Sequence, residues 1–340
     1  MKQFTIYEVS SMKRKENAPT MKDVAREAGV ALGTVSKVFN NILVGEDYRR
    51  RVEEAAKRLG YQVNSYARGL KTNRTCSAAL ILPNVTAPFF AMLAQEVCSA
   101  LAQRGYRTVL FTTAYDPEAE QRCIRMVQQN KVDGIIGLTY NPSLEVAPQL
   151  PYVSIDRYFS PSVPCVSSDN FGGGQMAAEK LLELGCERPL FLRIGSRVPG
   201  ESDKRGDGFE AVFRQRGMEC ASLRLNDEDG LEPFRRFLAG HMTEGRLDFD
   251  GIFCVTDALV VHIRTMLLEL GLRVPEDVQL IGFDGIRRFA EEGFICSTIV
   301  QPVSRLAETG VELLLREDRS NLPSLVCLPV SYAPGGTTKE

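Results

Sequence analysis

Residues 20–40 carry the first strong pattern of apolar and polar positions, because apolar side chains recur there at helical spacing. Thr20 and Asp23 stand three positions apart, the spacing at which a hydroxyl and a carboxylate cap the free N–H groups of a helix start. Gly29 can take the positive φ that ends a helix. The apolar positions of the pattern are Val24, Ala25, Ala28, Val30, Val35 and Val38. The pattern predicts two short helices joined by a tight turn.

A helix pair of this kind is typical of a helix-turn-helix, in which the second helix enters the major groove of DNA. Ala25 supports this interpretation, because a bulkier side chain would hold the two crossing helices apart. A third helix is expected to begin at residues 45–47 and to end at Gly60, which would close a three-helix head. Small helix pairs joined by glycine are common in other proteins, but the combination of cap, alanine, glycine and valines favours DNA binding.

From Ser77 onward, short apolar runs alternate with amphipathic segments, which indicates a parallel sheet covered by helices on both faces. The expected strands are 78–82, 108–111, 134–138, 152–155, 189–194, 251–254 and 278–283. The expected helices are 89–104, 117–130, 172–184, 204–216 and 257–270. The fold class predicted is therefore a small all-α head followed by α/β structure, with two doubly wound parallel-sheet subdomains.

Composition adds the distribution of charge. The chain of 340 residues has a net charge of −2, but residues 1–75 hold 15 Lys and Arg against 8 Asp and Glu, and the remainder holds 26 against 35. A basic head on an acidic body suits a head that meets phosphate groups. Nine scattered cysteines without a CxxC pair, and only two histidines, favour a reducing cytoplasm and no metal or cofactor. No apolar run suggests a signal peptide or a membrane span.

Polar residues just beyond the strands are candidate ligand-binding groups, because ligands of open α/β sheets lie past the carboxyl ends of the strands. Carboxylates, guanidinium groups and amides make paired hydrogen bonds to adjacent hydroxyls, and an aromatic face covers the C–H side of a sugar ring. The candidates are Phe89, Phe90, Asp156, Arg157, Arg205, Thr256, Asp284 and Gln301. They predict a site for a sugar-like small molecule.

Several of these positions have simpler interpretations. Asp257 is expected to cap a helix rather than to bind a ligand, and Asp284 would serve equally as a cap or in a turn. One of Phe89 and Phe90 is expected to lie in the core. The run 171–175, Phe-Gly-Gly-Gly-Gln, hints at a phosphate loop but lacks GxGxxG and the Walker lysine, so it is interpreted as a tight helix start.

An enzyme is not supported by the sequence. Neither His241 nor His262 lies in a recognisable nucleophile or metal pattern, and neither GxSxG nor HExxH occurs. A periplasmic solute-binding protein would explain the predicted small-molecule site but not the predicted DNA-binding head. A regulator of transcription explains both.

Three motifs resemble the lac repressor family of bacterial transcription regulators: the octet that starts at Asp23 (DVAREAGV), the run that starts at Thr34 (TVSKV) and Leu59-Gly-Tyr. The resemblance extends over most of the chain and implies a periplasmic-binding-protein-like core of type I. It implies four segments: a disordered extension 1–19, a helix-turn-helix domain 20–62, a hinge 63–76 and an effector-binding core 77–340. The core would divide into an N-subdomain, about 77–184 and 301–329, and a C-subdomain, about 185–300 and 330–340. The chain would cross between them near Gly185, Gln301 and Pro329.

The resemblance also implies partners and residue roles. Family members bind a pseudo-palindromic DNA operator as homodimers, and a small-molecule effector in the cleft changes that binding. The positions that match DNA contacts are Leu32, Gly33, Thr34, Ser36, Lys37, Asn40 and Leu70. Leu70 matches the hinge leucine that enters the minor groove. Release from the operator by a sugar-like effector is therefore expected.

Departures from the family pattern leave the effector open. Ala87 and Thr256 stand where asparagines are common, so a corepressor-type response to a purine or another non-sugar metabolite is the alternative. Ala31 stands where a serine usually caps the second helix. In the hinge, Val63 stands where the family usually has proline, and Gly69 costs a helix about 1 kcal/mol relative to alanine, so the hinge is expected to fold less readily than that of its relatives.

Overall fold

The computed structural model describes residues 19–39, 42–61, 75–129, 132–288 and 292–339. The chain forms two compact units, residues 1–73 and 74–340, which are treated separately below. Asn40, Leu70 and almost all of the expected extension and hinge lie outside the described residues.

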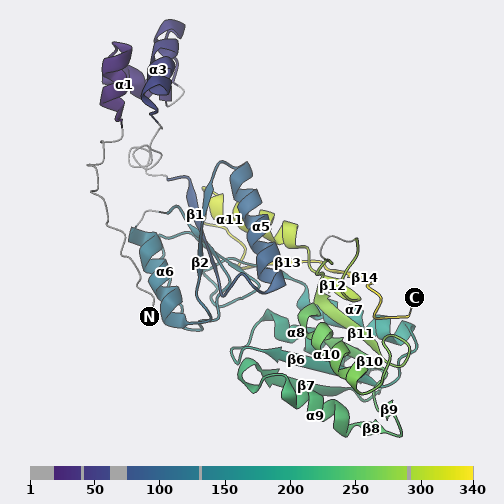
Figure 1. Ribbon diagram of the computed structural model, residues 1–340. Coiled ribbons are helices and arrows are strands. Elements are labelled where there is room, and N and C mark those ends of the chain that lie inside the picture. Colours follow the sequence, from purple (N-terminus) through teal and green to yellow (C-terminus); the bar gives the residue numbers. More distant parts are fainter. Residues whose placement is uncertain (1–18, 40–41, 62–74, 130–131, 289–291, 340) are drawn as a thin grey trace, which may run out of the picture. The chain divides into compact units, whose positions relative to one another are not determined.

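The head contains three helices, α1 (Met21–Ala28), α2 (Leu32–Phe39) and α3 (Glu46–Leu59) (Figure 1). Thr20 and Asp23 form the expected reciprocal cap, and Gly29 ends α1 at φ 61°. The side chain of Arg51 on α3 donates to the carbonyls of Ala28 and Gly29, which ties the end of α1 to the third helix. The buried core is Val24, Ala25, Ala28, Val35, Val38, Val52, Ala55 and Ala56. The predicted three-helix head is confirmed.

The second unit consists of two lobes, each built on a sheet of six strands. The first lobe has the strand order β13-β5-β4-β3-β1-β2 and the second has β14-β12-β11-β10-β6-β7. Neighbouring strands are parallel except for the antiparallel pair β12 and β14. This arrangement confirms the predicted fold class.

The first lobe holds its helices on both faces of the sheet (Figure 1). Successive side chains of a strand point to opposite faces, so Leu80 packs in the core beneath α5 and α11 while Ile81 packs beneath α6. The bounds are β1 Ser77–Leu82, α5 Pro88–Gln103, β2 Arg107–Thr112, α6 Pro117–Gln129, β3 Ile135–Gly137, β4 Tyr152–Ile155, β5 Cys165–Ser168, α11 Val303–Leu315 and β13 Leu325–Leu328.

The second lobe has the larger continuous core, centred on Phe191, Phe209 and Phe253, whose ring centroids lie 5.1–6.2 Å apart. Its bounds are α7 Asn170–Glu183, β6 Pro189–Gly195, η1 Glu201–Asp203, α8 Lys204–Gln215, β7 Ala221–Asn226, η2 Asp227–Asp229, α9 Glu232–Gly240, β8 Met242–Thr243, β9 Arg246–Leu247, β10 Gly251–Cys254, α10 Asp257–Glu269, β11 Gln279–Asp284, β12 Thr298–Val300 and β14 Ser331–Ala333. Within the described residues, no helix is both long and apolar enough to cross a membrane.

The first crossing between the lobes differs from the expectation. The chain leaves the first sheet after β5 and enters the second lobe with α7, so it crosses near residue 169 and not near Gly185. Ala177, Ala178 and Leu181 of α7 belong to the core of the second lobe. The backbone of α7 also lies directly against that of α8, at Gly174 and Gly208. The chain returns to the first lobe after Val300 and leaves it again after Leu328.

Glu120 on α6 is a buried carboxyl in the first lobe, 4% exposed. One of its oxygens accepts a hydrogen bond from Thr139 Oγ1 at 2.8 Å. Within the described residues, the other oxygen and the buried hydroxyl of Tyr152 have no hydrogen-bond partner. Burial raises the pKa of Glu120 to about 7, so this carboxyl is ionised in the folded protein only above neutral pH.

We expect Glu120→Gln to stabilise the protein at pH 8 and to have little effect at pH 5. The unfolded chain releases this proton near the ordinary pKa of 4.5 and the folded chain near 7. The wild type therefore loses up to about 1.4 kcal/mol per pH unit between these values, because the folded state binds more protons. Thermal unfolding followed by circular dichroism at pH 5 and pH 8 measures the difference. Glu118→Gln, on the exposed side of the same helix, is the control, and an equal gain for Glu120→Gln at both pH values would contradict the assignment.

Candidate effector cleft and recognition helix

A cavity of about 320 Å³ lies between the two lobes. Its wall comes from residues that follow strands of both sheets, together with the start of α5 and the start of α10. The candidates of the sequence analysis that line it are Phe89, Phe90, Asp156, Arg157, Arg205, Thr256 and Asp284. Gln301 does not line it. Other wall residues include Tyr115, Tyr140, Arg193, Ser196, Ser202, Asp227, Ala258 and Ile286.

Arg205 is the centre of this site. It lies on α8 of the second lobe, is 2% exposed, and stacks over the Phe283 ring at 3.7 Å. Its Nη2 lies 3.8 Å from Asp156 Oδ2, and its Nη1 lies 3.3 Å from Asp284 Oδ1. Asp156 follows β4 of the first lobe, and Asp284 ends β11 of the second. The guanidinium group therefore joins carboxylates of both lobes at the base of the cavity.

Arg205 also donates hydrogen bonds to neutral acceptors. Nη1 donates to the carbonyl of Val255 at 2.7 Å and Nε donates to Asn170 Oδ1 at 2.8 Å. Asn170 in turn donates to Asp156 Oδ1 at 3.0 Å. A buried charge needs such partners, because desolvation otherwise exceeds the Coulomb gain.

Gln301 positions Asp284 rather than facing the cavity. Its amide donates to Asp284 Oδ1 at 2.8 Å, while its oxygen accepts from Ser168 Oγ at 2.8 Å. Burial raises the pKa of Asp284 to about 7, and Arg205 opposes this shift. The carboxylates of the site also stand on unusual backbone, since φ is 130° at Asp284 and 53° at Asp156. Such strained positions persist where the surrounding structure holds them.

Thr256 lines the cavity and also takes the capping role that was expected of Asp257. Thr256 is the N-cap of α10, and its hydroxyl accepts from the N–H of Leu259 at 3.3 Å. Asp257 is fully buried and accepts from the N–H of Ile286 at 2.7 Å and from Cys296 Sγ at 3.4 Å. The expectation that Asp257 caps the helix is therefore wrong, because its carboxylate turns inward to the loop after β11.

Arg157 bridges the lobes at the side of the cavity. Its guanidinium stacks on the Tyr140 ring at 3.8 Å and donates to the carbonyls of Val198 and Pro199 at 3.0 and 3.1 Å. A Cβ at Gly200 would lie 2.2 Å from Arg157 Nη1, so glycine is required for this close approach.

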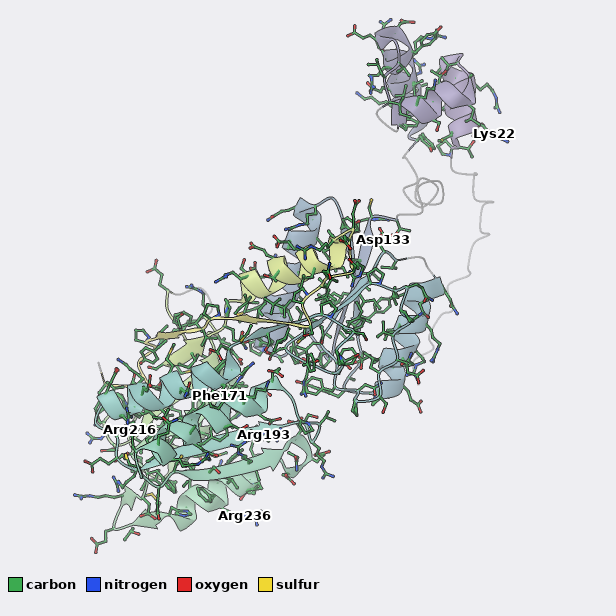
Figure 2. The ribbon with its side chains drawn as sticks, turned by 180° about the vertical axis from the view of Figure 1, so that it is seen from behind. Lys22, Asp133, Phe171, Arg193, Arg216 and Arg236 are labelled. Carbon is green, nitrogen blue, oxygen red and sulfur yellow. The ribbon has the colours of Figure 1, made fainter. Side chains whose placement is uncertain are left out.

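The loop 196–203 that Arg157 meets is held from its own lobe by Arg193 on β6 (Figure 2). Arg193 donates to Asp203 Oδ1 at 2.9 Å, and to the carbonyls of Leu225 at 2.8 Å and Ser196 at 2.7 Å. Ser196 and Ser202 of this loop line the cavity. The loop is thus fixed by one arginine from each lobe.

The aromatic residues of the wall divide between core and cavity. Phe90 is buried in the core of the first lobe and Phe89 is half-buried beside it, which agrees with the expectation that one of them is a core residue. Tyr140 packs edge-on against Tyr115 at 5.0 Å between ring centroids. Phe89, Tyr115 and Tyr140 therefore offer rings to a bound ligand.

Tyr115 and Asp227 are the main residues that the sequence analysis missed. Tyr115 accepts a hydrogen bond from Asn84 at 3.2 Å, which leaves its own O–H to donate. Burial raises the pKa of Tyr115 to about 12, and the negative charge of Asp227 adds to the shift. Both residues follow strands, β2 and β7, as the candidates do. The rule would have found Asp227 if β7 had been predicted.

The glycine-rich run at the start of α7 allows the backbone of α8, which carries Arg205, to approach closely. A Cβ at Gly174 would lie 1.9 Å from the carbonyl oxygen of Arg205, and a Cβ at Gly208 would lie 2.0 Å from that of Phe171 (Figure 2 labels Phe171). The backbones of α7 and α8 are therefore in direct contact. The N–H of Gly172 donates to Asp169 at 2.8 Å, so the start of α7 is capped from within, as expected for a tight helix start.

On the recognition helix α2, Leu32, Gly33 and Lys37 are exposed, and Thr34 and Ser36 are half-buried. Val35 and Val38 face the core of the head. This division leaves one side of α2 free for a base edge, and the DNA contacts of these five residues remain predictions. Within the described part of the chain, no cluster of three or more His, Cys, Asp or Glu side chains is arranged to hold a metal ion.

A helix-turn-helix head followed by two lobes around a cleft defines a ligand-responsive DNA-binding protein. Residues 20–64 match the family described as bacterial regulatory proteins, lacI family, and residues 75–314 match periplasmic binding proteins and sugar binding domain of LacI family. The chain therefore belongs to the LacI family.

Three similar proteins illustrate the range of the family. A sucrose operon repressor of Pediococcus pentosaceus is 31% identical over 325 residues, which are 94% of this chain and 99% of that protein. A transcriptional repressor PurR of Haemophilus influenzae is 31% identical over 87% of this chain and 90% of its own length. The structure of the lac repressor dimer bound to operator and the anti-inducer ONPF shares the fold, with a TM-score of 0.79 and 20% identity over 95% of this chain and 100% of that one.

We expect Gly174→Ala to destabilise the core unit by about 1–3 kcal/mol, because the added methyl group forces α7 and α8 apart. Gly240→Ala is the matched control, since it also replaces a helical glycine but meets no atom within 4 Å. Alanine there should be neutral or slightly stabilising. Urea unfolding of both variants gives the two free energies. Equal stabilities would contradict the backbone contact between α7 and α8.

Proposed function

We propose that this chain is a transcriptional repressor that binds a pseudo-palindromic operator as a homodimer and is released when a small hydroxylated effector occupies the cleft. The observation that carries the proposal is the Arg205 cluster, in which carboxylates of both lobes meet one guanidinium group beside aromatic rings. Membership of the LacI family supports a regulator rather than an enzyme. We place its action in the cytoplasm.

The DNA-binding part of the proposal is supported by the head. A single three-helix head offers little surface, and a homodimer doubles it and reads two half-sites. Leu32, Gly33 and Lys37 would reach base edges, while Thr34 and Ser36 suit phosphates near the start of the helix. For Asn40 and Leu70, the proposed DNA contacts rest on the family resemblance alone.

The effector class follows from the chemistry of the cavity wall. Asp156, Asp227 and Asp284 accept hydrogen bonds, the Tyr115 hydroxyl can donate one, and the half-buried Phe89 offers a ring face. A volume of about 320 Å³ lies at the lower end of small-molecule sites, which suits a sugar or sugar derivative. Similarity to the sucrose operon repressor supports this class, whereas similarity to PurR supports the alternative, a purine acting as corepressor.

An effector changes operator affinity only by its differential affinity for two arrangements of the protein. Asp156 and Arg157 belong to the first lobe, and Arg205 and Asp284 to the second. A ligand that touches all four would hold the lobes together. We propose that closure moves the first lobes of the dimer and the linkers that leave them.

We expect Lys37→Ala to change base preference at one base pair of each half-site by about 1–3 kcal/mol. Lys57→Ala removes the same charge from the exposed side of α3 and should leave base preference unchanged. In vitro selection from a random duplex library, followed by titration at several salt concentrations, measures both. Affinity should fall steeply with salt, because phosphate contacts release counterions. Equal binding to random and selected duplexes would overturn the DNA-binding proposal.

We expect Asp227→Asn to weaken the binding of a hydroxylated effector about tenfold, since it removes a charged acceptor whose side chain makes no hydrogen bond within the described residues. Glu228→Gln, in the same short helix but outside the cavity wall, is the control. D-ribose, sucrose and hypoxanthine are tested by thermal shift, because a ligand at 100 times its Kd adds about 2.7 kcal/mol to the free energy of unfolding. Binding of hypoxanthine together with tighter operator binding selects the corepressor alternative.

A further inference from the structure

The chain enters the core unit through a clamp made by one carboxylate. Asp133, just before β3, accepts the N–H of Thr75 at 2.7 Å and its hydroxyl at 3.0 Å through Oδ1. Its Oδ2 accepts the N–H of Cys76 at 2.8 Å. Asp133 thus takes up two consecutive backbone donors of the residues that precede β1 (Figure 2 labels Asp133). These residues are the first described ones after the linker.

The clamped backbone is held on its other side as well. The carbonyl of Cys76 accepts from the N–H of Arg107 on β2 at 2.9 Å. Cys76 has φ 48°, a left-handed conformation that side chains with a Cβ rarely adopt. Such a conformation persists when surrounding contacts determine it. The backbone at residues 75–76 is therefore held by the carboxylate of Asp133 and the N–H of Arg107 together.

The second lobe has a similar clamp. Asp250, just before β10, accepts through Oδ1 the N–H groups of Glu187 and Arg188, at 3.1 and 2.9 Å, immediately before β6. Its Oδ2 accepts from the side-chain Nε of Arg188 at 3.2 Å, whereas Oδ2 of Asp133 takes a second backbone N–H. The sequences VDGII at 132–136 and FDGIF at 249–253 place the two aspartates alike. In both lobes the strand after the aspartate is a parallel neighbour of the strand that is clamped.

The clamps differ in their hydrogen bonds and in what precedes them. The chain before Glu187 comes from α7 of the same lobe, whereas the chain before Thr75 comes from the head. A purely structural role would confine the effect of each aspartate to the stability of its own lobe. We propose that Asp133 is a positioning residue that couples the first lobe to the linker, so that movement of the lobe changes the linker and DNA binding changes the cleft. This inference rests on the proposed function.

The physical reason is that Asp133 prevents the chain from rotating about residues 75–76. With Asp133 in place, the backbone at residues 75–76 is rigidly attached to β3, and a rotation of the lobe carries the start of the linker with it. Without the carboxylate, Cys76 is free to leave its left-handed conformation, and the chain can rotate about residues 75–76. Coupling between two sites is reciprocal, so its loss is visible from the DNA side without an identified effector.

The test compares full-length wild type, Asp133→Asn and Asp250→Asn, each with the duplex that in vitro selection yields for the wild type. Each asparagine keeps the size of the side chain and one acceptor oxygen, and each removes the negative charge and one acceptor oxygen of its clamp. Hydrogen exchange of the cleft segments 156–158 and 196–203 is followed with and without the duplex. Thermal unfolding of both variants shows whether they lose similar stability.

We expect the duplex to change exchange in the cleft about fivefold or more in the wild type and in Asp250→Asn, the range of ordinary allosteric coupling. In Asp133→Asn the change should fall to less than half of that. Equal changes in the two variants, or no change in the wild type, would overturn the inference while leaving DNA binding intact. Failure to select any duplex would instead overturn the proposed function. If Asp133→Asn does not fold, Thr75→Val takes its place. This variant removes one of the three hydrogen bonds to Asp133, and the duplex should then cause a smaller change of hydrogen exchange in the cleft than in the wild type.

Discussion

The cleft depends on the burial of one guanidinium group. Arg205 has almost no contact with solvent, and its charge is balanced by carboxylates from both lobes and by two neutral acceptors. Leaving a buried charge without its partner costs about 3–5 kcal/mol, so the four groups are arranged as a unit. The position of Arg205 depends in turn on glycines at the contact of α7 and α8, where a single methyl group has no room.

The two lobes have similar arrangements of strands and carboxylates. Each places a parallel sheet so that its strands end at the cavity, and each puts a carboxylate on left-handed backbone there, Asp156 in one and Asp284 in the other. At the opposite ends of the strands, Asp133 and Asp250 clamp the start of β1 and β6. A rigid lobe with fixed points at both ends of its strands transmits a change at the cleft without bending, because packed interiors resist deformation.

The sequence by itself determined whatever depends on neighbouring residues. The capping box of Thr20 and Asp23, the helix end at Gly29 and the apolar face of the head are local, and all were predicted. The alternation of buried strands and helices was sufficient for the α/β class. The rule that polar residues beyond strands line a cleft found Asp156 and Asp284, because parallel strands bring their carboxyl ends to one edge, whereas Arg205, on α8, was a candidate by resemblance. It missed Asp227, because β7 is half-exposed and lacks an apolar run.

The tertiary structure decided what depends on distant partners. The helix α7 joins the second lobe because Gly174 and Gly208 allow its backbone to touch α8, which no periodicity reveals. Gln301 holds Asp284 instead of facing the cavity, because Ser168 occupies its other end. Thr256 caps α10 because Asp257 is drawn to the N–H of Ile286, a residue 29 positions away. Local patterns thus specify which residues are polar and where elements begin, whereas the direction of each side chain is decided by hydrogen-bond partners that only the folded chain brings together.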